Sequence, residues 1–187
     1  MRSQLLGGAV VVAALGAAAL LLARPATDGP LDVAYEAGVV VQAFPAGSTV
    51  TYGLQILGNT SRTSTIELVS LTPVLGDPPA EVLGEAMLLG PERVEALGVG
   101  GFDVMAGWPP AGVTPLEVAG QLVPPQTNAH YEVVLPVSVP QDGMVIIEGF
   151  DVEYRVEGRP YRERSSTTLV LCPVESYQQC LEFEQNL

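Results

Sequence analysis

The stretch that decides the fold is residues 150–156, FDVEYRV, in which every second residue is apolar and the residues between them are charged. Successive side chains of a β-strand point to opposite faces, so this alternation predicts a strand with one buried and one solvated face. A turn at 157–159, EGR, leads into a second charged run at 161–164, and the two runs predict a hairpin. On its solvated face we expect cross-strand ion pairs among Glu153, Arg155, Arg162 and Arg164.

Period-two patterns of the same kind recur along most of the chain after residue 38. They predict strands near 39–44, 49–57, 64–73, 81–89, 116–123, 129–139, 144–156 and 161–172. No amphipathic helix of crossover length separates them, which argues against a parallel sheet. We therefore expect an all-β fold, an immunoglobulin-like antiparallel β-sandwich.

The composition suits short strands joined by turns, because 20 Gly and 16 Pro accompany 48% hydrophobic and only 16% charged residues. The chain has 187 residues, which is enough for one self-sufficient core after an apolar leader. We expect two parts: residues 1–27 as an N-terminal transmembrane anchor and residues 28–187 as one extracytoplasmic β-sandwich domain.

The anchor rests on residues 5–23, LLGGAVVVAALGAAALLLA, nineteen residues without a charge between Arg2 and Arg24. As a helix this run spans about 28 Å, close to the hydrocarbon thickness of a bilayer. The competing interpretation is a cleaved signal peptide, but the run is long for a signal core and its end, LLLARP at 20–25, is a poor cleavage site. We expect a single-pass helix in the cell membrane, with the C-terminal domain outside.

The charge balance is one-sided: all eight basic residues are Arg, 21 residues are acidic, and the net charge is −13. Phosphate backbones require clustered cations, so this balance argues against a nucleic-acid partner. A domain that is acidic on average is also repelled by anionic lipid head groups.

Cys172 and Cys180 are the only cysteines, and seven residues separate them just after the last predicted strand. In an oxidising exterior they are expected to form a structural disulfide. A redox pair is typically C-x-x-C, and two thiolates with one histidine do not complete a zinc site.

Candidate chemistry is sparse along the whole sequence. His130 is the only histidine, which is too few for a blue-copper centre or a three-histidine zinc site, although copper held by His130 with a methionine stays open. No serine lies in a G-x-S-x-G elbow, and neither a calcium loop nor a Gly-rich phosphate loop occurs. We expect no catalytic residues, no cofactor and no metal site, and hence no enzyme.

One segment invites a functional interpretation: residues 90–115, GPERVEALGVGGFDVMAGWPPAGVTP, in which ten of 26 residues are Gly or Pro. Loops of this length in a compact domain often carry binding residues, and large apolar side chains on them resemble interface anchors. The candidate contacts for a partner are Phe102, Met105, Trp108, Pro109 and Pro110. The alternative is that the segment folds back over an open end of the sandwich, so that Trp108 belongs to the core.

Several motifs together resemble uncharacterised membrane-anchored proteins of actinobacteria with an extracytoplasmic immunoglobulin-like domain. They are the anchor, the NTS turn with its following β-run at 59–71, the G-x-x-V-x-Y-x-x-x-G-R-x-Y pattern at 149–161, and LVLCP at 169–173. The resemblance implies a sandwich and its compartment but carries over no functional residue.

These observations lead to one main functional hypothesis, a membrane-tethered interaction or structural module of the cell envelope that binds an envelope protein. The second hypothesis is an envelope accessory protein that binds a small ligand or metal ion. An uncommon hydrolase is the third.

Overall fold

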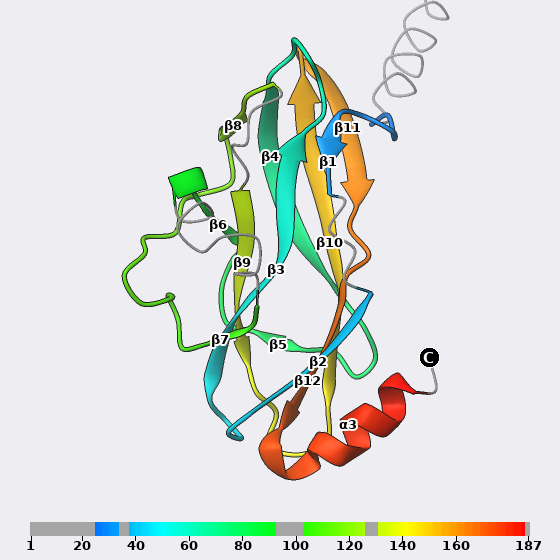
Figure 1. The fold of residues 1–187 in the computed structure, drawn as a ribbon. Helices are drawn as coiled ribbons and strands as arrows, with labels where there is room; N and C mark the ends of the chain where they lie inside the picture. Colours follow the sequence, from blue (N-terminus) through cyan, green and yellow to red (C-terminus); the bar gives the residue numbers. More distant parts are fainter. Residues whose placement is uncertain (1–24, 34–37, 93–102, 126–130, 186–187) are drawn as a thin grey trace, which may run out of the picture.

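In the computed structural model, which describes residues 25–33, 38–92, 103–125 and 131–185, two β-sheets pack face to face (Figure 1). The expected all-β sandwich is therefore confirmed. The predicted membrane helix at 5–23 lies outside the described residues, and among the residues described no helix is long and apolar enough to cross a membrane.

The first sheet has the strand order β1-β3-β9-β5 and is antiparallel throughout. Two short strands extend it, since β6 also pairs with β9 and β7 pairs with β3. Its strands are β1 (Leu31–Asp32), β3 (Thr49–Asn59), β5 (Glu81–Val82), β6 (Met87–Leu89), β7 (Met105–Ala106) and β9 (Tyr131–Ser138).

The second sheet has the order β2-β12-β10-β4-β8, with β11 paired to β10. All of its pairs are antiparallel except β2 with β12, which run parallel. Its strands are β2 (Val39–Phe44), β4 (Ile66–Leu75), β8 (Leu122–Val123), β10 (Val145–Val156), β11 (Arg159–Arg164) and β12 (Thr168–Pro173).

Strand β10 contains the 150–156 stretch, and the predicted alternation is confirmed there. Phe150, Val152 and Tyr154 are buried between the sheets, whereas Asp151 is half-buried and Arg155 is exposed on the outer face. The predicted hairpin is also confirmed, because β10 and β11 pair from Asp151↔Arg164 to Val156↔Arg159.

At Gly149, the strand that pairs with one edge of β10 changes from β12 to β11. Residues 145–147 pair with β12, whereas residues from Asp151 onward pair with β11. Gly149 has a φ of 122°, and a Cβ there would meet the backbone carbonyl of Ser165. Ser165 is buried and bonds Phe150 twice: its amide donates to the Phe150 carbonyl, and its Oγ accepts from the Phe150 amide, both at 2.9 Å.

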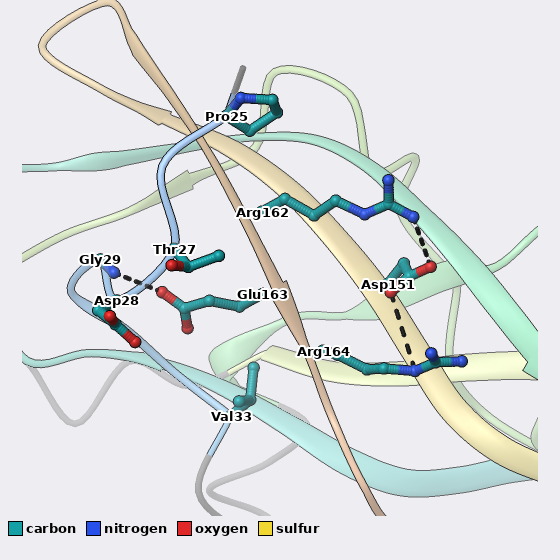
Figure 2. A pocket seen from close by; sticks show the side chains of 9 residues that line it. All are labelled: Pro25, Thr27, Asp28, Gly29, Val33, Asp151, Arg162, Glu163 and Arg164. Carbon is teal, nitrogen blue, oxygen red and sulfur yellow. Dashed lines mark hydrogen bonds and ion pairs between the residues drawn. The ribbon is translucent and has the colours of Figure 1, made fainter.

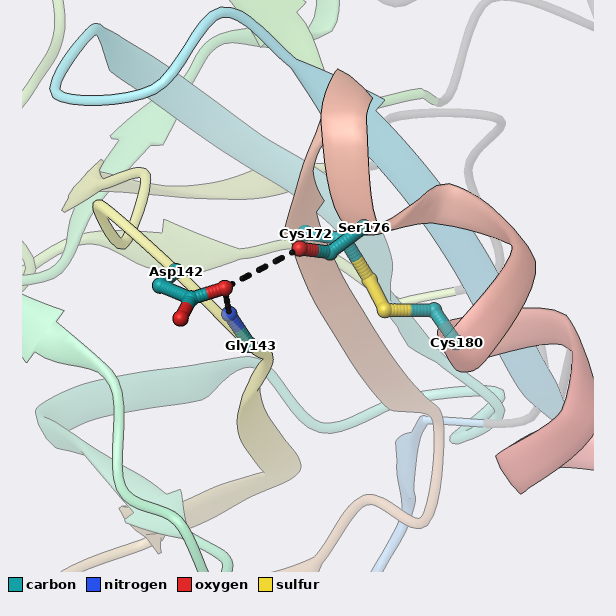
Figure 3. Close-up of a disulfide and its surroundings, with 5 residues drawn as sticks. All are labelled: Asp142, Gly143, Cys172, Ser176 and Cys180. Carbon is teal, nitrogen blue, oxygen red and sulfur yellow. Dashed lines mark hydrogen bonds between the residues drawn. A yellow bond between two sulfur atoms is a disulfide. The ribbon is translucent and has the colours of Figure 1, made fainter.

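The C-terminal tail forms helix α3 (Tyr177–Glu184) after a 3-10 turn, η1 (Val174–Ser176). The predicted disulfide is present and joins Cys172 at the end of β12 to Cys180 in α3, with the Cα atoms 6.7 Å apart (Figure 3). Both cysteines are buried in a small apolar cluster with Ile146 and Val170. The bridge therefore fixes α3 against the outer face of the second sheet.

The NTS sequence at 59–61 forms a turn that the side chain of Asn59 stabilises with three hydrogen bonds. Asn59 is only 7% exposed, and its Nδ2 donates to the carbonyls of Ser64 and Val123, each at 2.9 Å. Its Oδ1 accepts from the Ser61 amide at 2.9 Å. The side chain therefore ties the β3–β4 loop to β8.

Three predicted strands differ from the observed ones. The 81–89 run is interrupted between β5 and β6, and the 161–172 run is interrupted between β11 and β12. The 116–123 run holds only β8, because Gly120 turns the chain with a φ of 81° and its amide bonds the Leu68 carbonyl. Strands β1 and β7 and helix α3 are additions that no sequence period indicated.

Candidate functional site

The segment at 103–110 is fixed to the edge of the first sheet. Within it, β7 pairs with β3 through Val50↔Ala106 and Thr51↔Met105. The amide of Gly107 donates to the Thr49 carbonyl at 2.8 Å, and Thr51 Oγ1 donates to the Gly107 carbonyl at 2.6 Å. These bonds give this part of the long loop a defined backbone position.

A second attachment lies just before β7. Gln42 Nε2 on β2 donates to Asp103 Oδ1 at 3.2 Å, and the same oxygen accepts from the Val104 amide at 2.7 Å. Val104 is 6% exposed and belongs to the main core. The segment thus spans from β2 in one sheet to β3 in the other.

The predicted partner contacts are presented unequally. Phe102 lies outside the described residues. Met105 and Trp108 are half-buried, Pro109 is exposed after a cis peptide bond, and Pro110 is buried. Val104 and Pro110 are buried, as expected if the segment packs on the sandwich. Trp108 and Pro109 keep accessible surface, as a partner contact requires. Their role as a contact surface stays a prediction.

A buried carboxylate lies beside this segment. Glu132 is fully buried on β9, in the apolar run YEVVLPV at 131–137. A Cβ at Gly53 would lie 2.5 Å from Glu132 Oε1 and 2.8 Å from the Asp103 carbonyl, so only glycine fits at position 53. The acidic residue inside an apolar run was the available sequence signal for this feature.

A cleft of about 880 Å³ runs along β11, between this strand and the N-terminal segment at 25–33 (Figure 2). Arg162 and Arg164 lie on one side of β11 with Asp151, and Glu163 points to the other side, toward Gly29. The full lining is Pro25, Thr27, Asp28, Gly29, Val33, Asp151, Arg162, Glu163 and Arg164. The sequence had indicated the charges of this strand but not the cleft.

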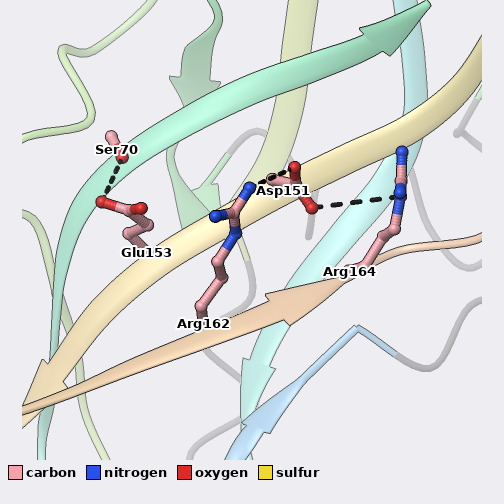
Figure 4. Close-up of polar contacts among 5 residues, drawn as sticks. All are labelled: Ser70, Asp151, Glu153, Arg162 and Arg164. Atoms are coloured by element: carbon pink, nitrogen blue, oxygen red, sulfur yellow. Dashed lines mark hydrogen bonds and ion pairs between the residues drawn. The ribbon is translucent and has the colours of Figure 1, made fainter. Parts of the chain in front are cut away.

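Asp151 forms ion pairs with both arginines of the cleft (Figure 4). Arg162 donates to Asp151 Oδ2 at 2.6 Å, and Arg164 lies 3.9 Å from Oδ1. The hydrogen bond and charge of Asp151 raise the pKa of Arg162. The predicted ion pair between Glu153 and Arg162 is wrong. Although Glu153 lies directly opposite Arg162, it accepts a hydrogen bond from Ser70 Oγ at 3.4 Å.

The inner wall of the cleft is fixed by Glu163. Its Oε1 accepts from the Gly29 amide at 2.8 Å and from the hydroxyl of Tyr154. Burial, and next the hydrogen bond to Glu163, raise the pKa of Tyr154. The Tyr154 ring stacks on Tyr161 with centroids 5.3 Å apart. These contacts attach the N-terminal segment to the second sheet. The carboxylates and guanidinium groups that line the cleft suit a polar or ionic ligand.

Metal ligands do not cluster in the part of the chain that the structure describes, where no group of three His, Cys, Asp or Glu side chains is arranged to hold an ion. His130 lies outside the described residues, so its role is untested. The absence of a cofactor and of catalysis remains a prediction from the sequence.

No family model matches this chain, and no curated protein matches it in sequence. By its fold, the chain is an all-β sandwich domain.

Proposed function

We propose that the chain is a membrane-tethered, extracytoplasmic module of the cell envelope, with an immunoglobulin-like sandwich that binds a protein partner. The tether is residues 5–23. The partner surface is the segment at 103–110, centred on Trp108 and Pro109. No catalytic activity belongs to this proposal.

The strand order supports the immunoglobulin-like part of the proposal. With strands lettered along the chain, β1-β3-β9-β5 corresponds to A-B-E-D and β12-β10-β4 to G-F-C, the arrangement of immunoglobulin-type sandwiches. Strand β2 then continues strand A across to the other sheet. The chain departs from antibody domains in its disulfide, which joins β12 to α3 and not one sheet to the other.

The observation that carries the binding function is the fixed presentation of Trp108. Tryptophan is enriched among the residues that dominate binding energy, and a half-buried ring on a pre-ordered backbone loses little entropy on association. The hydrogen bonds of Thr51 and Gly107 hold the backbone next to Trp108. A partly exposed aromatic residue on a hydrogen-bonded backbone, beside exposed Pro109, therefore suits a protein contact.

The test is crosslinking in intact cells followed by affinity purification of the full-length protein and of Trp108→Ala. Replacement of the whole segment would also remove β7, so a point variant is the cleaner probe. The matched control is Leu122→Ala, because Leu122 is 56% exposed on the opposite sheet.

We expect one envelope protein to be captured by the unaltered chain and by Leu122→Ala but lost from Trp108→Ala, with all three melting at similar temperatures. Equal capture by Trp108→Ala overturns the assignment of the surface. A large loss of stability with unchanged capture shows that Trp108 serves packing alone.

The cleft along β11 favours a second candidate function, binding of a small polar ligand by the envelope domain. Its volume of about 880 Å³ is in the range of small-molecule sites, and Arg162 and Arg164 are each about half exposed within it. Thermal-shift screening of anionic metabolites tests this candidate, with Arg164→Gln as the variant expected to abolish any stabilisation.

A further inference from the structure

The positive charges of this acidic chain are confined, among the described residues, to one loop and one hairpin. Net charge is −13, yet every arginine described lies either in the β3–β4 loop or on the β10–β11 hairpin. These arginines are Arg62, Arg155, Arg159, Arg162 and Arg164.

We call residues 60–65 and 155–160 the basic end. The two segments adjoin, because Ser64 Oγ donates to Glu157 Oε1 at 2.9 Å and Ile66 pairs with Val156. Together they carry three arginines against one acidic residue, Glu157. The two segments therefore carry a net positive charge although the whole chain is negative, and the carboxylates close to them include Glu67, opposite Arg155, and Asp28 in the entering segment.

The opposite end of the sandwich, formed by α3 and the turn before β10, carries only negative charge among its described residues (Figure 1). Its acidic residues are Asp142, Glu175, Glu182 and Glu184. The described residues are thus more positive at the basic end than at the end that carries α3. A surface with negative potential favours the orientation in which the basic end faces it.

The chain enters the domain at the basic end. The Ala26 amide donates to the Pro160 carbonyl at 3.1 Å, and the Arg162 amide donates to the Ala26 carbonyl at 3.0 Å. The Thr60 amide also donates to the Pro30 carbonyl at 2.9 Å. Residue 26 is three residues from the end of the apolar run at 23, a reach of about 10 Å. Whatever surrounds the apolar run lies close to these arginines.

We propose that the basic end rests on the anionic lipid head groups of the membrane, with Arg62, Arg155 and Arg159 as the contact residues and α3 pointing away. The proposal rests on the proposed tether, which brings the bilayer surface within reach of these side chains. Net charge alone predicts repulsion, but the distribution of charge places the cations next to the membrane and most of the carboxylates further from it.

A half-buried tyrosine, Tyr161, lies beside this surface. The guanidinium of Arg159 lies 5.2 Å from the ring centroid of Tyr161, which is itself stacked on Tyr154. Tyrosine is enriched at the level of lipid head groups, because its ring is apolar and its hydroxyl is polar. Arg159 therefore packs on a tyrosine, a residue type that is favoured at the membrane surface.

The test compares the full-length chain in nanodiscs of phosphatidylcholine with nanodiscs of equal parts phosphatidylcholine and phosphatidylglycerol. The readout is amide hydrogen exchange of peptides that cover 60–65 and 155–160. We expect slower exchange of both peptides in the anionic discs, lost at high salt, and no change in the peptide that covers α3. Each arginine near an anionic surface favours the docked state about fivefold.

Two triple variants separate charge from structure. Arg62→Gln, Arg155→Gln and Arg159→Gln together remove the lipid-dependent protection, whereas Lys at the same three positions retains it. Equal exchange in both lipids for the unaltered chain overturns the docking, as does protection that survives the Gln variant.

Flotation of the full-length chain with vesicles distinguishes failure of the docking from failure of the tether. Flotation with neutral vesicles together with lipid-independent exchange keeps the tether and overturns the docking. Flotation with anionic vesicles alone overturns the tether and supports lipid binding by the basic end. Flotation with neither overturns both.

Discussion

The rings of Tyr52 and Phe150 meet edge to face across the two sheets, with centroids 5.2 Å apart and planes inclined by 64°. Tyr52 lies on β3 and Phe150 on β10, and both are fully buried. Under the immunoglobulin-like lettering that we propose, β3 and β10 are strands B and F, which a disulfide joins in an antibody domain. In this chain an aromatic contact links them, which leaves both cysteines for the attachment of α3.

The Tyr52 hydroxyl makes no hydrogen bond to any described atom, so the ring and not the hydroxyl is expected to stabilise the core. Tyr52→Phe is predicted to leave the free energy of unfolding unchanged or to raise it by about 1 kcal/mol, because a desolvated hydroxyl is removed. Tyr52→Ala is predicted to lower it by about 3–5 kcal/mol. Urea unfolding of both variants measures these changes, and a loss above about 1 kcal/mol in the Phe variant contradicts the first.

Alkaline pH is predicted to destabilise the domain through the same residue. Burial raises the pKa of Tyr52 above its ordinary value of 10, so the folded state keeps the proton after the unfolded state has lost it. This contribution is complete below pH 10 and declines above it, by about 1.4 kcal/mol per pH unit for one tyrosine. Unfolding free energies measured above pH 10 are expected to fall less steeply in Tyr52→Phe. Equal slopes contradict the assignment to this residue.

Gly149→Ala is predicted to lower the free energy of unfolding by at least about 2 kcal/mol, since alanine is strained at a φ of 122° and its Cβ meets the Ser165 carbonyl. Gly158→Ala is the matched control, because Gly158 has a φ of 79° but no neighbouring atom within 4 Å of the added Cβ. Only the backbone strain of about 1–2 kcal/mol is expected there. Thermal unfolding compares the two, and equal losses rule out the contribution of the contact.

Removal of the disulfide with Cys172→Ser and Cys180→Ser is predicted to cost about 2.5 kcal/mol, the chain-entropy value for so small a ring. An isolated helix of eight residues is unstable in water, so α3 is expected to fray while the sandwich stays folded. Hydrogen exchange of residues 177–184 reports this directly. Unchanged protection of these amides contradicts a role of the bridge in holding the helix.

The sequence predicted those parts of the fold that follow from a two-residue period, because burial of one strand face leaves an imprint on every second residue. The stretch at 150–156 is the clearest case, and Cys172 with Cys180 followed from their number and spacing. Pairings between distant segments leave no such imprint. The parallel contact of β2 with β12 and the two-residue strands β1 and β7 depend on tertiary neighbours.

The candidate sites were predicted less completely, for the same reason. The sequence indicated the apolar residues of 103–110 but not the hydrogen bonds from Thr51 and Gln42 that fix the segment. It indicated the charges of β11, but the cleft arises where Gly29 meets Glu163, which are 134 residues apart in the chain. The basic end depends on the contact of Ser64 with Glu157, which brings together two loops that are far apart in the sequence.

The envelope assignment and the lipid contact both depend on residues 5–23 remaining attached as a membrane anchor. The most direct measurement is the intact mass of the protein extracted from membranes of its own cells. We expect the mass of the whole chain, 19.6 kDa, in a fraction that resists extraction by carbonate. A soluble protein that lacks the first 23 to 26 residues identifies the apolar run as a cleaved signal peptide and contradicts the membrane anchor.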